Sequence, residues 1–138
     1  MSEPSFLTVD QVERLHENLI DRFGGSHGLR DRLLLEGVVL HPRNVYYYAQ
    51  GDLFDVAAAY AFHISEAQAF LDGNKRTAIA AALVFLEGNG VVVPSETDRL
   101  YEAMIAMVEK RMGKVQLAEL LRELATYGSE DRRSIQLS

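Results

Sequence analysis

One segment of the chain is apolar on almost every face of the helix that it predicts. Residues 78–86 read AIAAALVFL; an Asp72-Gly73 turn precedes them and Gly88-Asn89-Gly90 follows them. Because glycine and asparagine are typical of helix ends, we predict a helix from about Asn74 to Gly88. A helix without a polar face needs neighbours that cover it. The segment therefore predicts a bundle of helices around a buried central helix.

The rest of the chain also follows helical spacing, with apolar residues three and four positions apart. Thr8 and Gln11 form a capping-box pattern at the start of a helix that Gly24-Gly25 ends. Further helices are predicted at about 29–40, 52–68, 94–112 and 115–127. The connection at 42–51 contains three consecutive tyrosines, so we expect part of it to lie against the body of the protein. We predict an all-α fold, a compact bundle of about six helices.

Length and composition favour one folded domain over residues 1–138. Hydrophobic residues make up 48% of the chain, which is enough for a core and argues against disorder. We expect the core at about 8–127 and a flexible polar tail at 128–138. The chain has no cysteine, which excludes disulfides and thiolate metal sites.

No segment predicts export or membrane insertion. The N-terminal sequence MSEPSFLTVD is acidic and lacks the apolar region of a signal peptide, and the longest apolar run is too short to span a bilayer. We therefore expect a soluble, cytoplasmic protein that does not bind membranes. The net charge of −6 argues against direct binding of nucleic acid. A helical DNA-binding domain is therefore the weakest of the three functions that we consider.

The residues before the apolar helix, 68–77, read QAFLDGNKRT and carry the chemistry. Gly73 permits a tight turn and the close approach of a ligand to the backbone. The free N–H groups of a first helical turn, beside the Lys75 ammonium and the Arg76 guanidinium, favour a phosphate group. Asp72 is an oxygen ligand of the kind that Mg²⁺ takes together with substrate phosphates. The loop therefore predicts a site for a nucleotide phosphate with Mg²⁺.

The same residues also admit an ordinary structural explanation. Asp-Gly-Asn before a helix is common turn chemistry, in which Asn74 caps the helix or fixes the loop. A Lys-Arg pair in a first helical turn is usually solvated. The chain has no G-x-x-x-x-G-K-[ST] motif, so the site is not a P-loop.

QAFLDGNKRTA, followed by an apolar helix that ends in Asn-Gly, closely resembles the catalytic loop of the Fic/Doc family. The family pattern is roughly His-x-Phe-x-Asp-Gly/Ala-Asn-Lys-Arg-Thr-Ala. Upstream, Gly24-Gly25, residues 28–31 and Pro42 also resemble Doc, the death-on-curing toxin branch, so the resemblance covers about 8–125. Lys75 and Ile79 favour this branch, because members that transfer AMP usually have glycine at the first position and many have arginine at the second.

The resemblance implies a compact helical bundle and a transferase that uses ATP, or another nucleoside triphosphate, with Mg²⁺. Doc-like members resemble kinases that transfer the terminal phosphate to a hydroxyl of a target protein, a translation factor, and a small antitoxin holds them inactive. We therefore expect a Doc-like toxin of a toxin–antitoxin system with protein kinase activity. Transfer of AMP to a protein (AMPylation) is the alternative reaction.

The resemblance also implies roles for the loop residues. Asp72 corresponds to the carboxylate that holds the metal and the phosphate, and Phe70 to the buried residue that anchors the loop. The nucleotide phosphate cradle corresponds to Gly73, Asn74, Lys75 and Arg76. The expected catalytic residues are Gln68, Asp72, Lys75 and Arg76.

Gln68 departs from the family pattern at the position of the catalytic histidine. That histidine takes the proton of the attacking hydroxyl, which an amide cannot do near neutral pH. Three outcomes stay open: a weak or inactive enzyme that still binds nucleotide or partner, another group as the base, or Gln68 as an orienting residue while a phosphate oxygen takes the proton. A catalytically inactive binding protein on the Fic/Doc scaffold is therefore the second hypothesis.

The histidines supply the candidates for a substitute base. His63 is the only histidine that the sequence places near the loop, five positions before Gln68. A packed, hydrogen-bonded core histidine is favoured over a base there, and the same interpretation applies to His16. No pair has H-x-x-x-H spacing, which argues against zinc.

The tyrosines of the connection at 42–51 and the nearby Arg43 each have a functional and a structural interpretation. Tyr46, Tyr47 and Tyr48 can form a flap over the nucleotide, but packing of the loop onto the core is favoured. Arg43 can reach a phosphate, but a solvated arginine is favoured. Met104 and Met107 are expected in the core.

Overall fold

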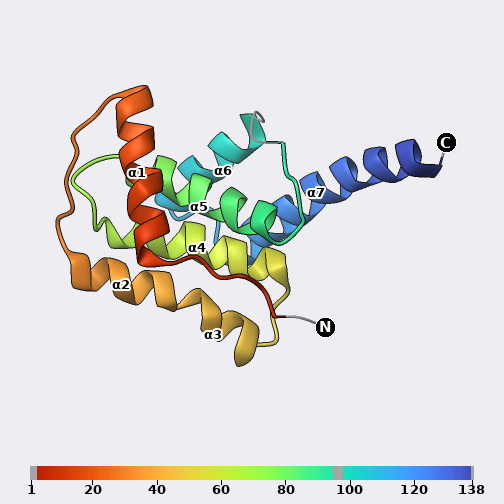
Figure 1. The fold of residues 1–138 in the computed structure, drawn as a ribbon, viewed down its shortest axis with the longest axis horizontal. Helices are drawn as coiled ribbons and strands as arrows, with labels where there is room; N and C mark the ends of the chain where they lie inside the picture. The colour runs from red at the N-terminus through yellow and green to blue at the C-terminus, as the bar shows by residue number, and fades with distance from the viewer. Residues whose placement is uncertain (1–2, 95–97, 138) are drawn as a thin grey trace.

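The computed structural model describes residues 3–94 and 98–137, and side chains as far as Ala125. Within these residues the chain forms helices only, which confirms the all-α prediction (Figure 1). Seven helices occur in the described part of the chain: α1 (Val9–Phe23), α2 (Arg32–Leu40), α3 (Pro42–Tyr47), α4 (Leu53–Ala67), α5 (Asn74–Gly88), α6 (Asp98–Val108) and α7 (Lys114–Leu137).

Short polar side chains start three of these helices. Thr8 accepts from the N–H of Gln11, and the Gln11 side chain reaches back, so the predicted capping box is confirmed. Asp52 caps α4 in the same way. Asp31 caps α2, which therefore begins later than the predicted Leu29. Leu29 instead forms an isolated antiparallel bridge with Phe70.

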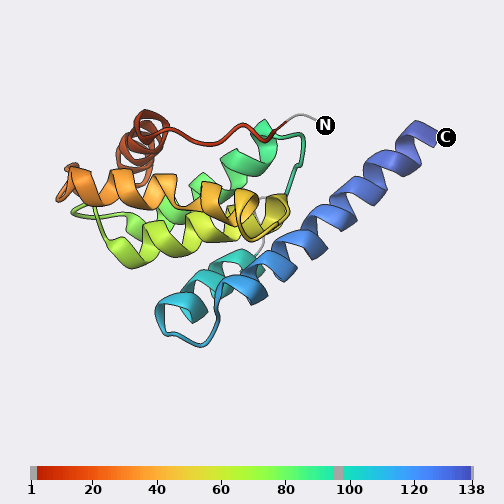
Figure 2. The same ribbon diagram turned by 90° about the horizontal axis from the view of Figure 1, so that it is seen from below.

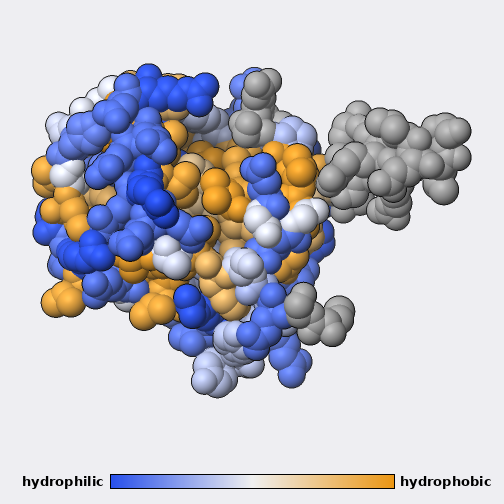
Figure 3. Space-filling view, viewed as in Figure 1, coloured by the Kyte–Doolittle hydropathy of each residue, from blue (hydrophilic) through white to orange (hydrophobic). Residues whose placement is uncertain are grey.

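The most deeply buried helix is α4, not α5 as the sequence analysis expected. Helix α4 packs against α2, α3, α5, α6 and α7. Eight of its residues are buried, and small side chains bring its neighbours close: Val56, Ala57, Ala58, Ala59, Tyr60, Ala61, Ile64 and Ser65. Helix α5 is covered by α1, α4 and α6 but keeps Val84 36% exposed. Apolar surface is visible over α5, beside the polar surface of α1 (Figure 3).

Helix α3 is an addition to the predicted elements, in the segment expected to be an ordered connection. Pro42 occupies its first turn, where proline is tolerated because no N–H is needed there. The rings of Tyr46 and Tyr47 contact Phe6 at centroid distances of 6.0 and 5.8 Å. Tyr48 is 83% exposed. Two of the three tyrosines therefore pack the segment onto the body, as expected.

Helices α6 and α7 differ from the sequence prediction at their ends. The predicted start of the fifth helix includes Ser95, which lies outside the described residues. Helix α6 ends at Val108, before the predicted Met112. Helix α7 continues past the predicted 127 to Leu137 and extends away from the bundle (Figure 2). The mobility of residues 128–138 stays a prediction.

Among the described residues, no helix is long and apolar enough to cross a membrane.

Candidate functional site

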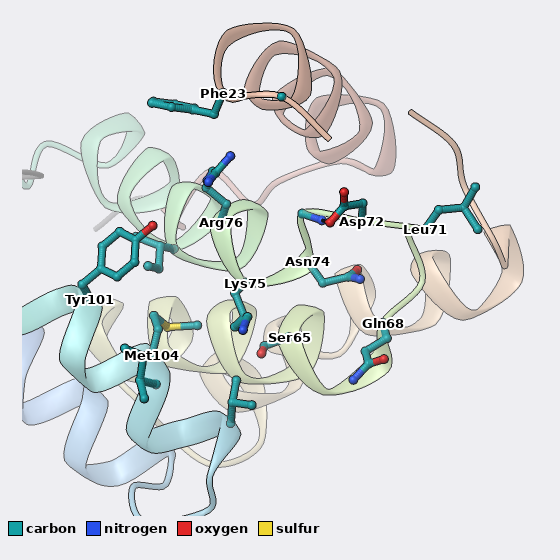
Figure 4. Close-up of a pocket in the computed structure, with 15 residues that line it drawn as sticks. Phe23, Ser65, Gln68, Leu71, Asp72, Asn74, Lys75, Arg76, Tyr101 and Met104 are labelled. Carbon is teal, nitrogen blue, oxygen red and sulfur yellow. Dashed lines mark hydrogen bonds between the residues drawn. The ribbon is translucent and has the colours of Figure 1, made fainter. Parts of the chain in front are cut away.

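The loop residues singled out from the sequence meet at one pocket of about 650 Å³. Its walls come from the end of α1, the end of α4, the start of α5 and the exposed side of α6 (Figure 4). The lining includes all six candidate residues, Gln68, Asp72, Gly73, Asn74, Lys75 and Arg76.

The loop that carries Phe70 is held by the extended backbone of residues 28–31, between α1 and α2. The N–H of Arg30 donates to the carbonyl of Ala69 at 2.7 Å, and the N–H of Leu71 donates to the carbonyl of Gly28 at 3.1 Å. The Arg30 guanidinium also donates to the main-chain oxygen of Gln68. These bonds fix the backbone on both sides of Phe70.

Phe70 and Asn74 lock the loop from inside. The Phe70 side chain is only 3% exposed, as expected of an anchor. Asn74 Oδ1 accepts from the N–H of Phe70 at 3.1 Å, and Asn74 Nδ2 donates to its carbonyl at 3.0 Å. Of the two roles that the sequence left open for Asn74, the side chain therefore fixes the loop. No side chain caps α5.

The carboxylate of Asp72 is oriented by backbone donors. Oδ1 accepts from the N–H of Gly73 at 2.8 Å, and Oδ2 accepts from the N–H of Ser26 at 3.1 Å. Each carboxylate oxygen has capacity for a further partner. Gly25 passes so close that a Cβ there would lie 2.7 Å from Asp72 Oδ2.

Gly25→Ala is expected to weaken ATP binding, whereas Gly24→Ala is expected to leave it unchanged. Both glycines have positive φ, 118° and 90°, so alanine costs each about 1–2 kcal/mol of backbone strain. Only the Cβ at Gly25 meets Asp72; at Gly24 nothing lies within 4 Å. Calorimetric titration with Mg·ATP, alongside thermal unfolding, tests this. Equal affinities in the two variants at equal stability would contradict it.

Two cations line the pocket beside the start of α5, with the Lys75 side chain on the side of Ser65 (Figure 4). Gly73 precedes α5 with φ 74° and ψ 19°, a left-handed conformation that glycine adopts without strain. Arg76 points toward Phe23, and its guanidinium carbon lies 4.8 Å from that ring's centroid. Within the described residues, neither Lys75 nor Arg76 is in a salt bridge. The arrangement fits an anion of phosphate size.

Gln68 lies at the C-terminal end of α4 in a left-handed conformation, φ 50° and ψ 46°. Its side chain is exposed and lines the pocket, as does Ser65 one turn earlier. No histidine among the described residues lines this pocket. The structure therefore brings no imidazole to the position where a substitute base would act.

His63 is packed away from the pocket, as the core interpretation predicts. Its Nε2 lies 3.3 Å from Lys114 Nζ, and its ring lies edge-on to His41 at 4.2 Å. Burial lowers the pKa of His63 to about 4, and the charges of Lys114 and His41 act in the same direction. The neutral ring accepts a hydrogen bond from the ammonium group.

We expect the protein to lose stability between pH 6.5 and 4 through His63. In this window the unfolded chain binds a proton at His63 and the folded chain does not, so the free energy of unfolding falls as pH falls. Because the side chain is only partly buried, solvent screening reduces the effect to about 1–2 kcal/mol. Urea unfolding at pH 7 and pH 4.5 measures it. His63→Gln, which cannot titrate, should remove that part of the pH dependence; an unchanged dependence would contradict the assignment.

His16, not His63, is the histidine that contacts the loop. The prediction that only His63 lies near the loop is wrong, because His16 on α1 meets Asp72 across 56 residues of sequence. His16 is 2% exposed, and its ring stacks on Phe70 at a centroid distance of 3.9 Å. It is a buried, hydrogen-bonded histidine, as expected, but its bond is to the main-chain oxygen of Asp72, at 2.7 Å.

The apolar wall of the pocket was not predicted from the sequence. Helix α6 contributes four side chains at helical spacing: Tyr101, Met104, Ile105 and Val108. Phe23, 56% exposed, contributes from the end of α1. Met104 is buried, as expected of a core residue, and lines the pocket as well. The i, i+3, i+4, i+7 spacing of these apolar residues indicates an apolar face on the helix, but it does not indicate which side of that face lines a pocket.

The tyrosine-rich segment does not line this pocket. Tyr46 and Tyr47 contact Phe6, and the guanidinium of Arg43 lies over the same Phe6 ring at 5.3 Å. The packing interpretation of Tyr46 and Tyr47 is therefore confirmed. Arg43 is half-buried rather than solvated, and it is directed to an aromatic ring instead of a phosphate.

Asp72 suits a metal that shares its ligands with a phosphate. No group of three or more His, Asp or Glu residues that could enclose a metal ion occurs in the described part of the chain. Mg²⁺ commonly takes one or two carboxylates and completes its shell with phosphate oxygens and water. The single Asp72 carboxylate, beside the helix start and the two cations, fits this mode of binding.

The sequence is similar to a family model and to two named relatives. A family model described as the Fic/DOC family matches residues 6–86. A relative named Protein kinase doc, from Escherichia phage P1, is 32% identical over 126 residues, 91% of this chain and 98% of the relative. Another relative, Toxin Doc from Mycolicibacterium smegmatis, is 42% identical over 78 residues, 55% of this chain and 60% of the relative. The protein belongs to the Fic/DOC family, and the resemblance to its Doc branch is confirmed.

Proposed function

We propose that this protein is a Doc-like toxin of a toxin–antitoxin system that transfers a phosphate from ATP to a hydroxyl of a target protein. The names of the two relatives, Protein kinase doc and Toxin Doc, support this class. We further propose that a small antitoxin is its partner and that a translation factor is its target. We propose that it acts in the cytoplasm, where ATP and translation factors are available.

One observation carries the proposal: Asp72, Gly73, Lys75 and Arg76 line the same pocket at the uncapped start of α5. Backbone N–H groups and two cations there supply charge stabilisation for a transferring phosphoryl group. Mg²⁺ held by Asp72 would neutralise charge that develops on the phosphate oxygens. The apolar side chains of α6 and Phe23 form the opposite wall, against which the rest of a nucleotide can lie.

The proposed reaction forms an O–P bond to the target hydroxyl and breaks the bond to ADP. Gln68 can donate or accept a hydrogen bond, and so orients the hydroxyl without taking its proton. The proton then passes to a phosphate oxygen. Without a general base we expect a rate below that of a family member with histidine by about 10²–10⁴-fold.

A protein that binds but does not transfer is the second candidate, and Gln68 is the observation that favours it. The phosphate-binding half of the pocket is complete without a base, whereas the described lining residues include no imidazole. In this case nucleotide or partner binding would itself be the function.

Incubation of the protein with a bacterial extract and labelled ATP tests both candidates. Label in a target protein from γ-labelled ATP supports phosphate transfer, and label from α-labelled ATP indicates AMP transfer instead. Arg76→Ala should abolish labelling, while Arg14→Ala, which removes an exposed arginine on α1 outside the pocket, should not. No labelling by any variant, together with tight Mg·ATP binding, would overturn the kinase and support the binding protein.

A further inference from the structure

A buried histidine of helix α1 contacts the proposed phosphate loop. His16 is 2% exposed and does not line the pocket. Its ring lies parallel to Phe70, with centroids 3.9 Å apart and an angle of 9° between the planes. Its Nε2 lies 2.7 Å from the main-chain oxygen of Asp72. His16 therefore contacts both Phe70, which anchors the loop, and the main chain of Asp72, the candidate metal ligand.

The chemistry of the bond assigns the proton on the ring. A carbonyl oxygen only accepts, so the Nε2–H of His16 donates to Asp72. Because Nε2 carries this hydrogen, it cannot take a proton from a substrate. His16 is thus excluded as the substitute base through this nitrogen, and its effect on the site runs through the loop.

The segment that follows α1 holds the Asp72 side chain. The N–H of Ser26, after α1, donates to Asp72 Oδ2, and Gly25 passes beside that oxygen. At Gly73, the neighbouring atoms of Ile20 and His16 would lie 3.1 and 3.7 Å from a Cβ. His16 on α1 therefore holds the main chain of Asp72, and Ser26 in the segment after α1 holds its carboxylate.

We propose that His16 is a positioning residue, which sets the orientation of Asp72 for metal and phosphate through its Nε2–H donor. The proposal rests on the proposed nucleotide-binding function of the pocket. An apolar side chain could fill the same space against Phe70, but would leave the Asp72 carbonyl, on the part-buried side of the loop, without this donor. The donor is the property that distinguishes positioning from simple packing.

Three variants separate the donor from the packing. His16→Phe keeps an aromatic ring against Phe70 and removes the donor. His16→Gln keeps an N–H donor and removes the ring. Val12→Ala, at a fully buried position one turn earlier on the same helix, lowers stability without removing a hydrogen-bond donor and is the matched control.

Calorimetric titration with ATP, with and without Mg²⁺, is the first measurement. We expect His16→Phe to weaken Mg·ATP binding by about tenfold, with the larger loss in the Mg²⁺-dependent part. His16→Gln should recover part of this loss. Val12→Ala should bind as the unchanged protein does. Equal affinity in His16→Phe and Val12→Ala would overturn the proposal.

Amide hydrogen exchange is the second measurement and needs no nucleotide. The N–H groups of Ser26, Phe70 and Leu71 bond to Asp72, Asn74 and Gly28 respectively. We expect them to exchange about tenfold faster in His16→Phe than in Val12→Ala. Unchanged exchange would reduce His16 to a packing residue. If the unchanged protein fails to bind ATP, the proposed function fails, while the exchange rates still decide the role of His16.

Discussion

Gln68→His is expected to raise the rate of phosphate transfer to a protein hydroxyl by about 10²–10⁴-fold. The change supplies an imidazole that can take the hydroxyl proton near neutral pH, which the glutamine amide cannot do. The comparison of rates with γ-labelled ATP, at equal protein concentration, measures the effect.

The geometry at residue 68 favours this result. The side chain there is exposed and lines the pocket, and the main-chain oxygen of Gln68 is held by Arg30. The backbone is left-handed, with φ 50°, a conformation in which histidine is found several-fold more often than most residues. A histidine can therefore replace Gln68 without a change in the loop.

Gln68→Ala is the matched control for the gain of the base. It removes the amide without supplying an imidazole, so its rate should stay at or below that of the unchanged protein. A Gln68→His variant that binds Mg·ATP normally but transfers no faster would contradict the assignment of residue 68 to the base position. If transfer appears only in Gln68→His, the unchanged protein is the binding protein of the second hypothesis.

The helices and the phosphate loop could be predicted because their signals are local. The capping box at Thr8 and the cap at Asp52 lie within four residues of the helices that they start. The Asp72–Arg76 stretch owes its place at a helix start to Gly73 and to the apolar run behind it. Each of these features is determined by residues that are neighbours in the sequence.

The contacts that complete the site could not be predicted, because they join distant parts of the chain. His16 meets Asp72 across 56 residues, and Ser26 meets it across 46. The α6 wall depends on which edge of an apolar stripe stays open beside α5. The position of α4 as the most deeply buried helix also depends on contacts with distant parts of the chain. Its alanines permit close packing of five neighbouring helices, which the length of an apolar run does not indicate.

Asp72→Asn is expected to weaken Mg·ATP binding by about a hundredfold, about 2.7 kcal/mol. The carboxylate is the only acidic side chain that lines the pocket in the described part of the chain, so its loss removes the ligand available for Mg²⁺. The asparagine amide has the same shape but only one acceptor oxygen, and its NH₂ group would face one of the two backbone N–H donors, from Gly73 or Ser26. Calorimetric titration with and without Mg²⁺ measures the affinity.

Asp31→Asn is the control for this substitution. Asp31 caps α2 with its side chain, which does not line the pocket, and its N–H, which asparagine retains, donates to the carbonyl of Ala69 at 3.1 Å. The same chemical change there should leave the affinity for Mg·ATP within about twofold, since asparagine caps helices as well as aspartate does. In Asp72→Asn, residual binding should no longer respond to Mg²⁺, because the remaining contacts, Lys75, Arg76 and the start of α5, act on the phosphate directly. Retention of the full Mg²⁺ dependence would show that the metal is held elsewhere and would remove Asp72 from the proposed mechanism.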